Sequence, residues 1–407
     1  MYEAVITGLG VVAPNGVGKD MFWDAVTKGK TGINRLKNLQ DSDCPCQIGG
    51  EIPVEWIIEK SDMLPDWVPD SKNSKFSVLA AMLALEDSGI TIEEISQRNS
   101  FVYMGTSIPD MEVFQDFYKS YEEKGIANPE ALVSGALHTP ATSISHIIKT
   151  YSKVITISMA CTSGAVSIDL AVDSVMRGEV DVAIAGGVDA PLTPLFMNGF
   201  SHTGLTPLSF NETPYNASRP FDNDREGGVL SEGAAVVVIE EKSRALRRKA
   251  RIYASFSGSG LSTAMSPSWM KTSFYNAMVE ALKNARLKPI DIDYISASAP
   301  GHPVIDLAEI DAIKDLFGSQ AYNIPISSIK STCGNPGAAS GPLQVITAVQ
   351  SIENNFIPPT VNLEQPGEGM DLDFVPNEGR VARVNKVMVN LRGLGGYTTS
   401  QIFSRVT

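Results

Sequence analysis

The segment VITISMACTSGAVSIDLAVDSVMRG, residues 154–178, contains the pattern that decides the fold. It starts with a run of β-branched residues typical of a strand and ends with apolar residues at helical spacing. Between them lies a corner of small residues that contains Cys161, one of only four cysteines in the chain. We therefore expect Cys161 at a turn from a strand into the N-terminus of a helix.

The same layout occurs again later in the chain. Residues 324–355, IPISSIKSTCGNPGAASGPLQVITAVQSIENN, again read as a strand, a glycine- and alanine-rich corner and a helix. Elsewhere apolar strands such as VDVAIAGG (180–187) alternate with amphipathic helices, which is typical of a layered α/β fold. We expect two similar halves, residues 1–250 and 251–407, in one compact unit with both corners at a central site.

Composition narrows the functional classes. The 407 residues are 43% hydrophobic, which suits a large core, and their formal net charge of −13 argues against nucleic acid as the main partner. Irregularly spaced cysteines favour a reduced, cytoplasmic protein over a disulfide scaffold. No signal peptide is expected, and no apolar run approaches the roughly 20 residues that span a bilayer. With no dinucleotide fingerprint, phosphate loop or metal-ligand pattern, we expect no membrane contact, no bound cofactor and no metal.

The corner leaves two roles open for Cys161. A thiol at a helix N-terminus gains thiolate character, and the free N–H groups of the first helical turn can stabilise a developing oxyanion. Such a cysteine can act as a nucleophile that accepts an acyl group. Most free cysteines are instead small buried hydrophobic residues, and that interpretation stays open at this point.

Several motifs make the chain resemble the β-ketoacyl synthases of fatty acid and polyketide synthesis over almost its whole length. They are AVITGLGVVAPNGVG (4–18), ISMACTSGA (157–165), ASRPFDNDREGGVLSEGAAVVVIE (217–240), IKSTCGNPGAASG (329–341) and RGLGGYTTSQIF (392–403). The resemblance implies the thiolase fold, in which two similar α/β halves pack into five αβαβα layers.

The resemblance also implies roles for matched residues. Cys161 stands where the family's nucleophile accepts an acyl chain from the phosphopantetheine arm of acyl carrier protein. Lys330 matches a lysine that organises the site between two histidines, which promote decarboxylation of a malonyl group and stabilise its enolate. Residues in segments expected to bind the substrate are Phe200, His202, Arg392, Leu394 and Gly395.

Both histidine positions are changed in this chain. In ASAPGHP (297–303), Pro300 occupies the first position and has no side-chain proton donor or acceptor. Asn335 occupies the second, where its amide can donate a hydrogen bond but cannot act as a general base. Arg392 stands in the slot of a gating phenylalanine. Efficient decarboxylative condensation by this chain alone is therefore not expected.

These changes lead to competing functional hypotheses. In the first, the chain resembles a chain-length factor, which pairs as a heterodimer with an intact Cys-His-His ketosynthase and shapes its chain tunnel; such subunits usually lack the cysteine. In the second, Cys161, His302 and Asn335 form a rearranged set in a non-standard ketosynthase or acyltransferase. In an intermediate case Cys161 accepts acyl groups without condensation. The last hypothesis is an inactive scaffold, and without a ketosynthase partner we expect a homodimer.

Overall fold

In a computed structural model that describes residues 2–40 and 42–406, the main path of the sheet in the N-terminal half runs β1–β8–β7–β5–β6, and the short strand β2 (Gly16–Val17) pairs with β1 off this path. The strands are β1 (Ala4–Ala13), β5 (Ser100–Gly105), β6 (Val154–Ile157), β7 (Val182–Asp189) and β8 (Gly233–Glu241). β1–β8 and β8–β7 pair antiparallel, whereas β7, β5 and β6 run parallel. β1, β5 and β7 are buried along their whole lengths, as expected for a sheet covered on both faces.

The sheet of the C-terminal half repeats this order and these directions. Its strands are β9 (Ala254–Thr263), β10 (Tyr294–Ser296), β11 (Ile326–Ser327), β14 (Lys386–Arg392) and β15 (Tyr397–Ser404). They lie in the order β9–β15–β14–β10–β11, with two antiparallel pairings followed by two parallel ones. This repetition confirms the expectation of two similar α/β halves.

A short antiparallel pairing joins the two sheets edge to edge. Val5 pairs with Ser255 and Ile6 with Ala254, so β1 and β9 connect the halves into one continuous path of strands. The expected boundary near residue 250 falls between α10 (Lys242–Arg247) and the start of β9.

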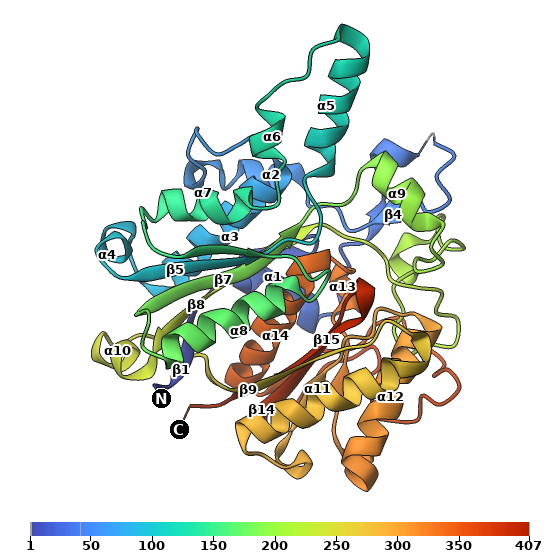
Figure 1. Cartoon of the computed structure of the whole chain (residues 1–407). Helices are drawn as coiled ribbons and strands as arrows, with labels where there is room; N and C mark the ends of the chain where they lie inside the picture. Colours follow the sequence, from blue (N-terminus) through green and yellow to red (C-terminus); the bar gives the residue numbers. More distant parts are fainter. Residues whose placement is uncertain (1, 41, 407) are drawn as a thin grey trace.

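Helices complete the five layers that the resemblance implied (Figure 1). α3 (Lys72–Ser88) and α7 (Thr139–Ile147) cover the outer face of the N-terminal sheet, and α11 (Met270–Ala285) and α12 (Pro303–Phe317) lie on the outer side of the C-terminal sheet. α8 (Ser163–Met176) and α14 (Ser340–Asn354) pack between the sheets. A Cβ added at Gly341 would lie 2.8 Å from the Cβ of Ala165, so small residues permit this close helix contact.

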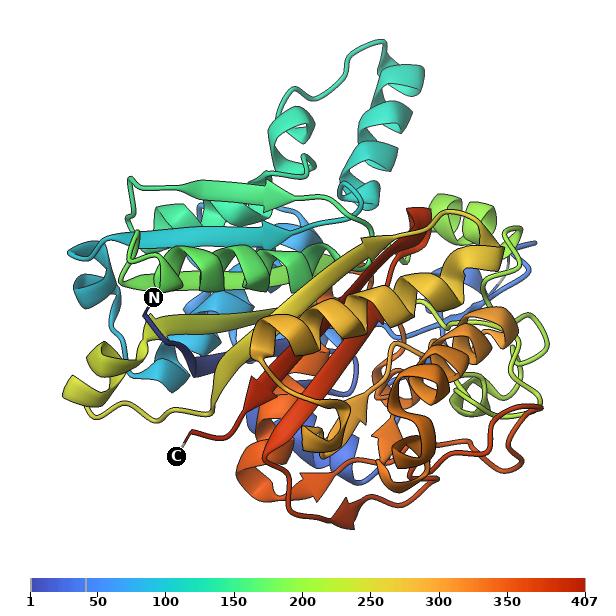
Figure 2. The same ribbon diagram turned by 60° about the horizontal axis from the view of Figure 1, so that its bottom comes forward.

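One helical arm projects from the body of the molecule (Figure 2). It consists of α5 (Met111–Lys124), none of whose residues is buried, and α6 (Ala131–Ser134). The remaining helices are α1 (Lys19–Thr27), α2 (Val54–Ile58), α4 (Ile92–Ser96), α9 (Pro194–Ser201) and α13 (Lys330–Cys333), and the short strands are β2 (Gly16–Val17), β3 (Asn34–Arg35), β4 (Ile48–Gly49), β12 (Phe356–Ile357) and β13 (Arg380–Val381). Among the described residues, no helix combines the length and apolarity needed to cross a membrane.

Candidate functional site

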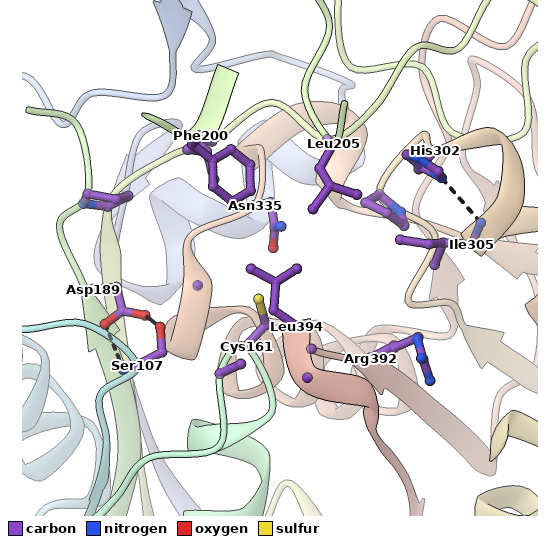
Figure 3. Close-up of a pocket in the computed structure, with 18 of the residues that line it drawn as sticks. Ser107, Cys161, Asp189, Phe200, Leu205, His302, Ile305, Asn335, Arg392 and Leu394 are labelled. Carbon is purple, nitrogen blue, oxygen red and sulfur yellow. Dashed lines mark hydrogen bonds between the residues drawn. The ribbon is translucent and has the colours of Figure 1, made fainter. Parts of the chain in front are cut away.

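A cavity of about 530 Å³ lies where the two glycine- and alanine-rich corners meet (Figure 3). The N-terminal half contributes Cys161, Asp189 and Phe200 to its wall, and the C-terminal half contributes His302, Asn335 and Arg392. Pro300, Lys330, Leu394 and Gly395 also line it. The structure therefore brings nearly all the sequence-predicted site residues to one cavity.

Cys161 sits at the predicted turn from strand to helix, just before α8. The preceding residue, Ala160, has a φ of +51°, a left-handed conformation that reverses the chain and turns the thiol toward the cavity. The hydroxyl of Ser163 fixes this turn, because it accepts from the backbone N–H of Met159 at 2.7 Å. Cys161 is half-buried, whereas the other three cysteines are buried, so its thiol is the one that the cavity presents to a ligand.

Neighbouring groups shift the pKa of the Cys161 thiol in opposite directions. Burial raises the pKa of Cys161, and the nearby carboxylate of Asp189 raises it further. The ammonium group of Lys330 lowers this pKa, as do the backbone N–H groups of Leu394 and of Cys161 itself. Both N–H groups stabilise the ionised sulfur, and backbone donors of this kind can also stabilise negative charge that develops beside it.

Lys330 is held deep in the wall behind the thiol. Its Nζ donates to the backbone oxygen of Ser298 at 2.5 Å, and only 3% of the residue is exposed. Burial lowers the pKa of Lys330, while the negative charges of Cys161 and Glu309 oppose this change. The matched lysine thus lies close enough to Cys161 to influence its ionisation.

Glu309 anchors the loop that carries Ser298. Its two oxygens accept from the backbone N–H groups of Ser298 and Ala299, each at 3.0 Å, and from the amide of Asn390 at 3.2 Å. Burial raises the pKa of Glu309 to about 7 despite these hydrogen bonds. Glu309 therefore positions the loop of Pro300 and the oxygen to which Lys330 is bonded.

Pro300 and Asn335, which the sequence resemblance matched to the family's two histidines, lie side by side at the cavity wall. A Cβ added at Gly228 would lie 3.1 Å from the Cβ of Pro300 and 3.8 Å from Nδ2 of Asn335. The hydroxyl of Ser340 donates to Oδ1 of Asn335 at 3.0 Å, which leaves the Nδ2 amide as the hydrogen-bond donor at this position. The wall thus offers one neutral donor and no proton-transfer group at these two positions.

His302 lines the cavity but serves as the N-cap of α12. Its Nδ1 accepts from the backbone N–H groups of Val304 and Ile305, at 3.2 and 3.4 Å. Figure 3 shows the ring pointing to the start of this helix, across the cavity from Cys161. Burial lowers the pKa of His302, in keeping with a neutral ring. The rearranged Cys161–His302–Asn335 set is therefore not assembled in this arrangement.

The predicted substrate-binding residues divide into two groups. Phe200 stacks on Phe196 with ring centroids 5.8 Å apart, and both rings line the cavity with Leu205. Arg392, Leu394 and Gly395 line the same cavity as the thiol of Cys161. His202 does not belong to the lining: it is exposed, and its Nδ1 lies 2.8 Å from the backbone oxygen of Asn198.

Asp189 is the site residue that the sequence reasoning missed. Its carboxylate accepts from the backbone N–H groups of Ser107 at 2.9 Å, Ile108 at 3.2 Å and Ala338 at 2.6 Å, and from the hydroxyl of Ser107. It thereby ties the loop after β5 to the second corner. Burial raises the pKa of Asp189 to about 6. The signal that could have found it is a lone acidic residue at the end of β7, whose other residues are small or apolar.

The fold and the cavity together define a class of protein: a thiolase-type α/β protein with a thiol at the N-terminus of its central helix. Comparison with models of known protein families assigns the chain to a particular family. The model "Beta-ketoacyl synthase, N-terminal domain" matches residues 2–245, and the model "Beta-ketoacyl synthase, C-terminal domain" matches residues 250–364. The chain belongs to the beta-ketoacyl synthase family.

Individual relatives agree with this assignment. The 3-oxoacyl-[acyl-carrier-protein] synthase 2 of Coxiella burnetii is 36% identical, over 99% of this chain and 99% of that protein. The tetracenomycin polyketide synthase ketoacyl synthase alpha subunit of Streptomyces glaucescens is 33% identical, over 99% of this chain and 97% of its own length. Among solved structures, the ishigamide ketosynthase/chain length factor matches with a TM-score of 0.90 at 26% identity, and a type II polyketide synthase acyl-carrier protein in complex with its ketosynthase matches with 0.90 at 27%; each match covers 100% of both chains.

Proposed function

We propose that this protein is a chain-length-factor-like subunit that binds acyl chains delivered by acyl carrier protein and works beside a ketosynthase with an intact Cys-His-His site. The observation that carries the proposal is the composition of the cavity wall. It retains a presented thiol, Cys161, but has Pro300 and Asn335 where the family places its two histidines. Such a wall can bind a thioester but lacks the groups that promote decarboxylation.

The thiol gives this subunit the means to accept an acyl group. Ionised Sγ of Cys161 attacks the thioester carbonyl, and the oxyanion that forms accepts from the backbone N–H groups of Cys161 and Leu394. The bond from carbonyl carbon to the sulfur of the pantetheine arm then breaks, and the departing thiolate takes up the proton that Cys161 released. This transfer needs no histidine, although the raised pKa of Cys161 makes it slow.

Decarboxylation requires catalytic groups that acyl transfer does not require. Carbon dioxide departs as an enolate forms, and the enolate oxygen needs hydrogen-bond donors at the position of the lost histidines. Asn335 offers a single amide there, and Pro300 offers none. Removing one such donor typically lowers kcat by about 10²–10³-fold. Without the two histidines, this subunit is therefore expected to depend on a complete ketosynthase for condensation.

Related structures favour a partner of this kind. One solved neighbour is described as a ketosynthase/chain length factor and another as an acyl-carrier protein in complex with its ketosynthase. By analogy, we assign to this chain an acyl carrier protein as donor and a complete ketosynthase as the second subunit. A homodimer is the alternative assembly, and it is distinguished by mixing the subunits.

The test is to measure acyl loading and condensation separately. The protein is incubated with acyl-loaded carrier protein, alone and with a complete ketosynthase, and its intact mass and the extended product are determined. We expect an adduct that Cys161→Ala abolishes and that Cys333→Ala, a substitution of a buried cysteine, leaves in place. Extended product is expected only with the second subunit. Condensation by the isolated protein that is lost in His302→Ala would overturn the proposal in favour of the rearranged set.

A further inference from the structure

Arg392 is a cation without a counter-ion in the wall of the candidate active site. It lines the same cavity as Cys161 and is half-buried. It forms no ion pair with any carboxylate in residues 2–40 or 42–406, and burial is the one influence that lowers its pKa. A guanidinium in this environment has lost part of its hydration without gaining a charged partner, which is costly unless a ligand supplies one.

The guanidinium is fixed in place by neutral acceptors. Nη1 donates to the backbone oxygen of Gly396 at 3.3 Å and to Oγ1 of Thr398 at 2.9 Å, and Nη2 donates to the backbone oxygen of Ala264 at 2.8 Å. These three hydrogen bonds leave Nε–H and one Nη2 hydrogen without a partner. Two remaining donors on a preorganised planar group match the two oxygens of a carboxylate.

The position of Arg392 limits where the anion can be. Arg392 is two residues from Leu394, whose backbone N–H lowers the pKa of Cys161. Figure 3 shows its side chain on the same side of the cavity as Ile305, away from the ring of Phe200. The cavity therefore has an aromatic side for an apolar chain, and its wall contains both the thiol of Cys161 and the cation of Arg392.

We propose that Arg392 binds the carboxylate of a short dicarboxylic acyl thioester, of which malonyl is the smallest, and so gives this cavity a preference for carboxyl-bearing acyl groups. The phosphate of a pantetheine arm is the other anion that such a ligand carries, but it lies at the opposite end of the arm from the sulfur. The proposal rests on the proposed function, because it assumes that the cavity receives acyl thioesters.

Pairing with Arg392 also opposes loss of the carboxylate. Decarboxylation converts the anionic group into neutral carbon dioxide, so a guanidinium that binds the anion stabilises the ground state more than the transition state. This effect agrees with the absence of proton-transfer groups at Pro300 and Asn335. Arg392 thus favours holding a carboxyl-bearing acyl group intact.

Calorimetry with two unreactive pantetheine amides tests the proposal. One carries a malonyl group that ends in a carboxylate, and the other carries its neutral malonamide counterpart of the same shape. We expect the wild-type protein to bind the carboxylate about 10- to 100-fold more tightly, the range of a charge-assisted hydrogen-bonded pair. Arg392→Gln should reduce this ratio to about one, and Arg392→Lys, which keeps the charge but not the fork, should keep part of it.

Controls separate the possible outcomes. Arg383→Gln removes an exposed arginine with the same charge and should preserve the ratio. Equal binding of both amides by the wild-type protein, or a ratio that survives Arg392→Gln, would refute the proposal; so would an Arg392-dependent gain in affinity from the phosphate of phosphopantetheine. If Arg392→Gln does not fold, the proposal is still tested by two affinity ratios of carboxylate to malonamide. These are the ratio of the wild-type protein and that of Arg392→Lys, which should be smaller but above one. Because the amides bind without reacting, failure of Cys161 to load overturns the proposed function and leaves this result standing.

Discussion

Substitution of Lys330 by methionine tests the electrostatics behind the thiol. Lys330 is the largest influence that lowers the pKa of Cys161, against the burial that raises it. Methionine keeps the length and apolar volume of the side chain but removes the charge and the hydrogen bond to Ser298. We expect the pKa of Cys161 to rise further and its reaction at neutral pH to slow.

The magnitude follows from the charge and from the chemistry of thiols. A full opposite charge a few ångströms away shifts a pKa by about 1–3 units, so its removal lowers the thiolate fraction at neutral pH by about 10- to 1,000-fold. A more basic thiolate is also more nucleophilic, with a Brønsted slope of about 0.4–0.5, which offsets nearly half of that loss on a logarithmic scale. The net expectation for Lys330→Met is a rate about 3- to 60-fold lower at neutral pH.

The assay is the rate of iodoacetamide alkylation of Cys161 between pH 6 and 10.5, followed by intact mass. Because burial raises the pKa of this thiol, the wild-type rate should climb with pH through the neutral range. The profile of Lys330→Met should lie at higher pH and meet or exceed the wild-type rate at its alkaline end. Cys161→Ala reports labelling of other thiols, and Lys28→Met controls for loss of an exposed lysine. Superimposable profiles for wild type and Lys330→Met would refute the reasoning.

Two further predictions concern the residues around the thiol. His302→Ala should lower the free energy of unfolding by about 0.5–2 kcal/mol, the usual contribution of an N-cap side chain. It should leave the rate of Cys161 alkylation within twofold of wild type. Alkylation that is tenfold slower would instead show that His302 takes part in the chemistry of the thiol. Pro300→His combined with Asn335→His should restore release of carbon dioxide from a malonyl thioester by at least about 100-fold over wild type, because each donor contributes about 10²–10³; an equal gain from Asn335→His alone would show that position 300 does not matter.

Much of the fold could be predicted from the sequence because several of its central strands, such as β1, β5 and β7, are buried along their whole lengths. Buried strands appear as continuous apolar runs, and the shared layout of two strand–corner–helix segments, residues 154–178 and 324–355, suggested two similar halves. The joining of the two sheets through β1 and β9 could not be predicted in this way. That contact involves two residue pairs with no distinctive side chains, so it depends on tertiary packing alone.

Site residues could be predicted from the sequence where a motif specifies the residue type. They could not be predicted where the role of a residue depends on the orientation of its side chain. Cys161, Lys330 and Asn335 follow from motifs, and the structure brings them to one cavity. The imidazole of His302 also reaches that cavity, but its role as a cap depends on the ring's orientation, which the spacing of residues does not give. Asp189 was not predicted as a site residue because its main partners are backbone N–H groups, which have no sequence signature.

The pairing of β1 has a consequence for how the chain folds during synthesis. The neighbour of β1 within its own sheet is β8, more than 200 residues further along, and the central helix α8 has its helical partner in α14, which is later still. Until those segments leave the ribosome, β1 has an open edge and α8 exposes apolar surface. Non-local contacts of this kind slow folding and favour aggregation of incomplete chains. A nascent chain of this protein should therefore depend on chaperones until the residues of α14 are made.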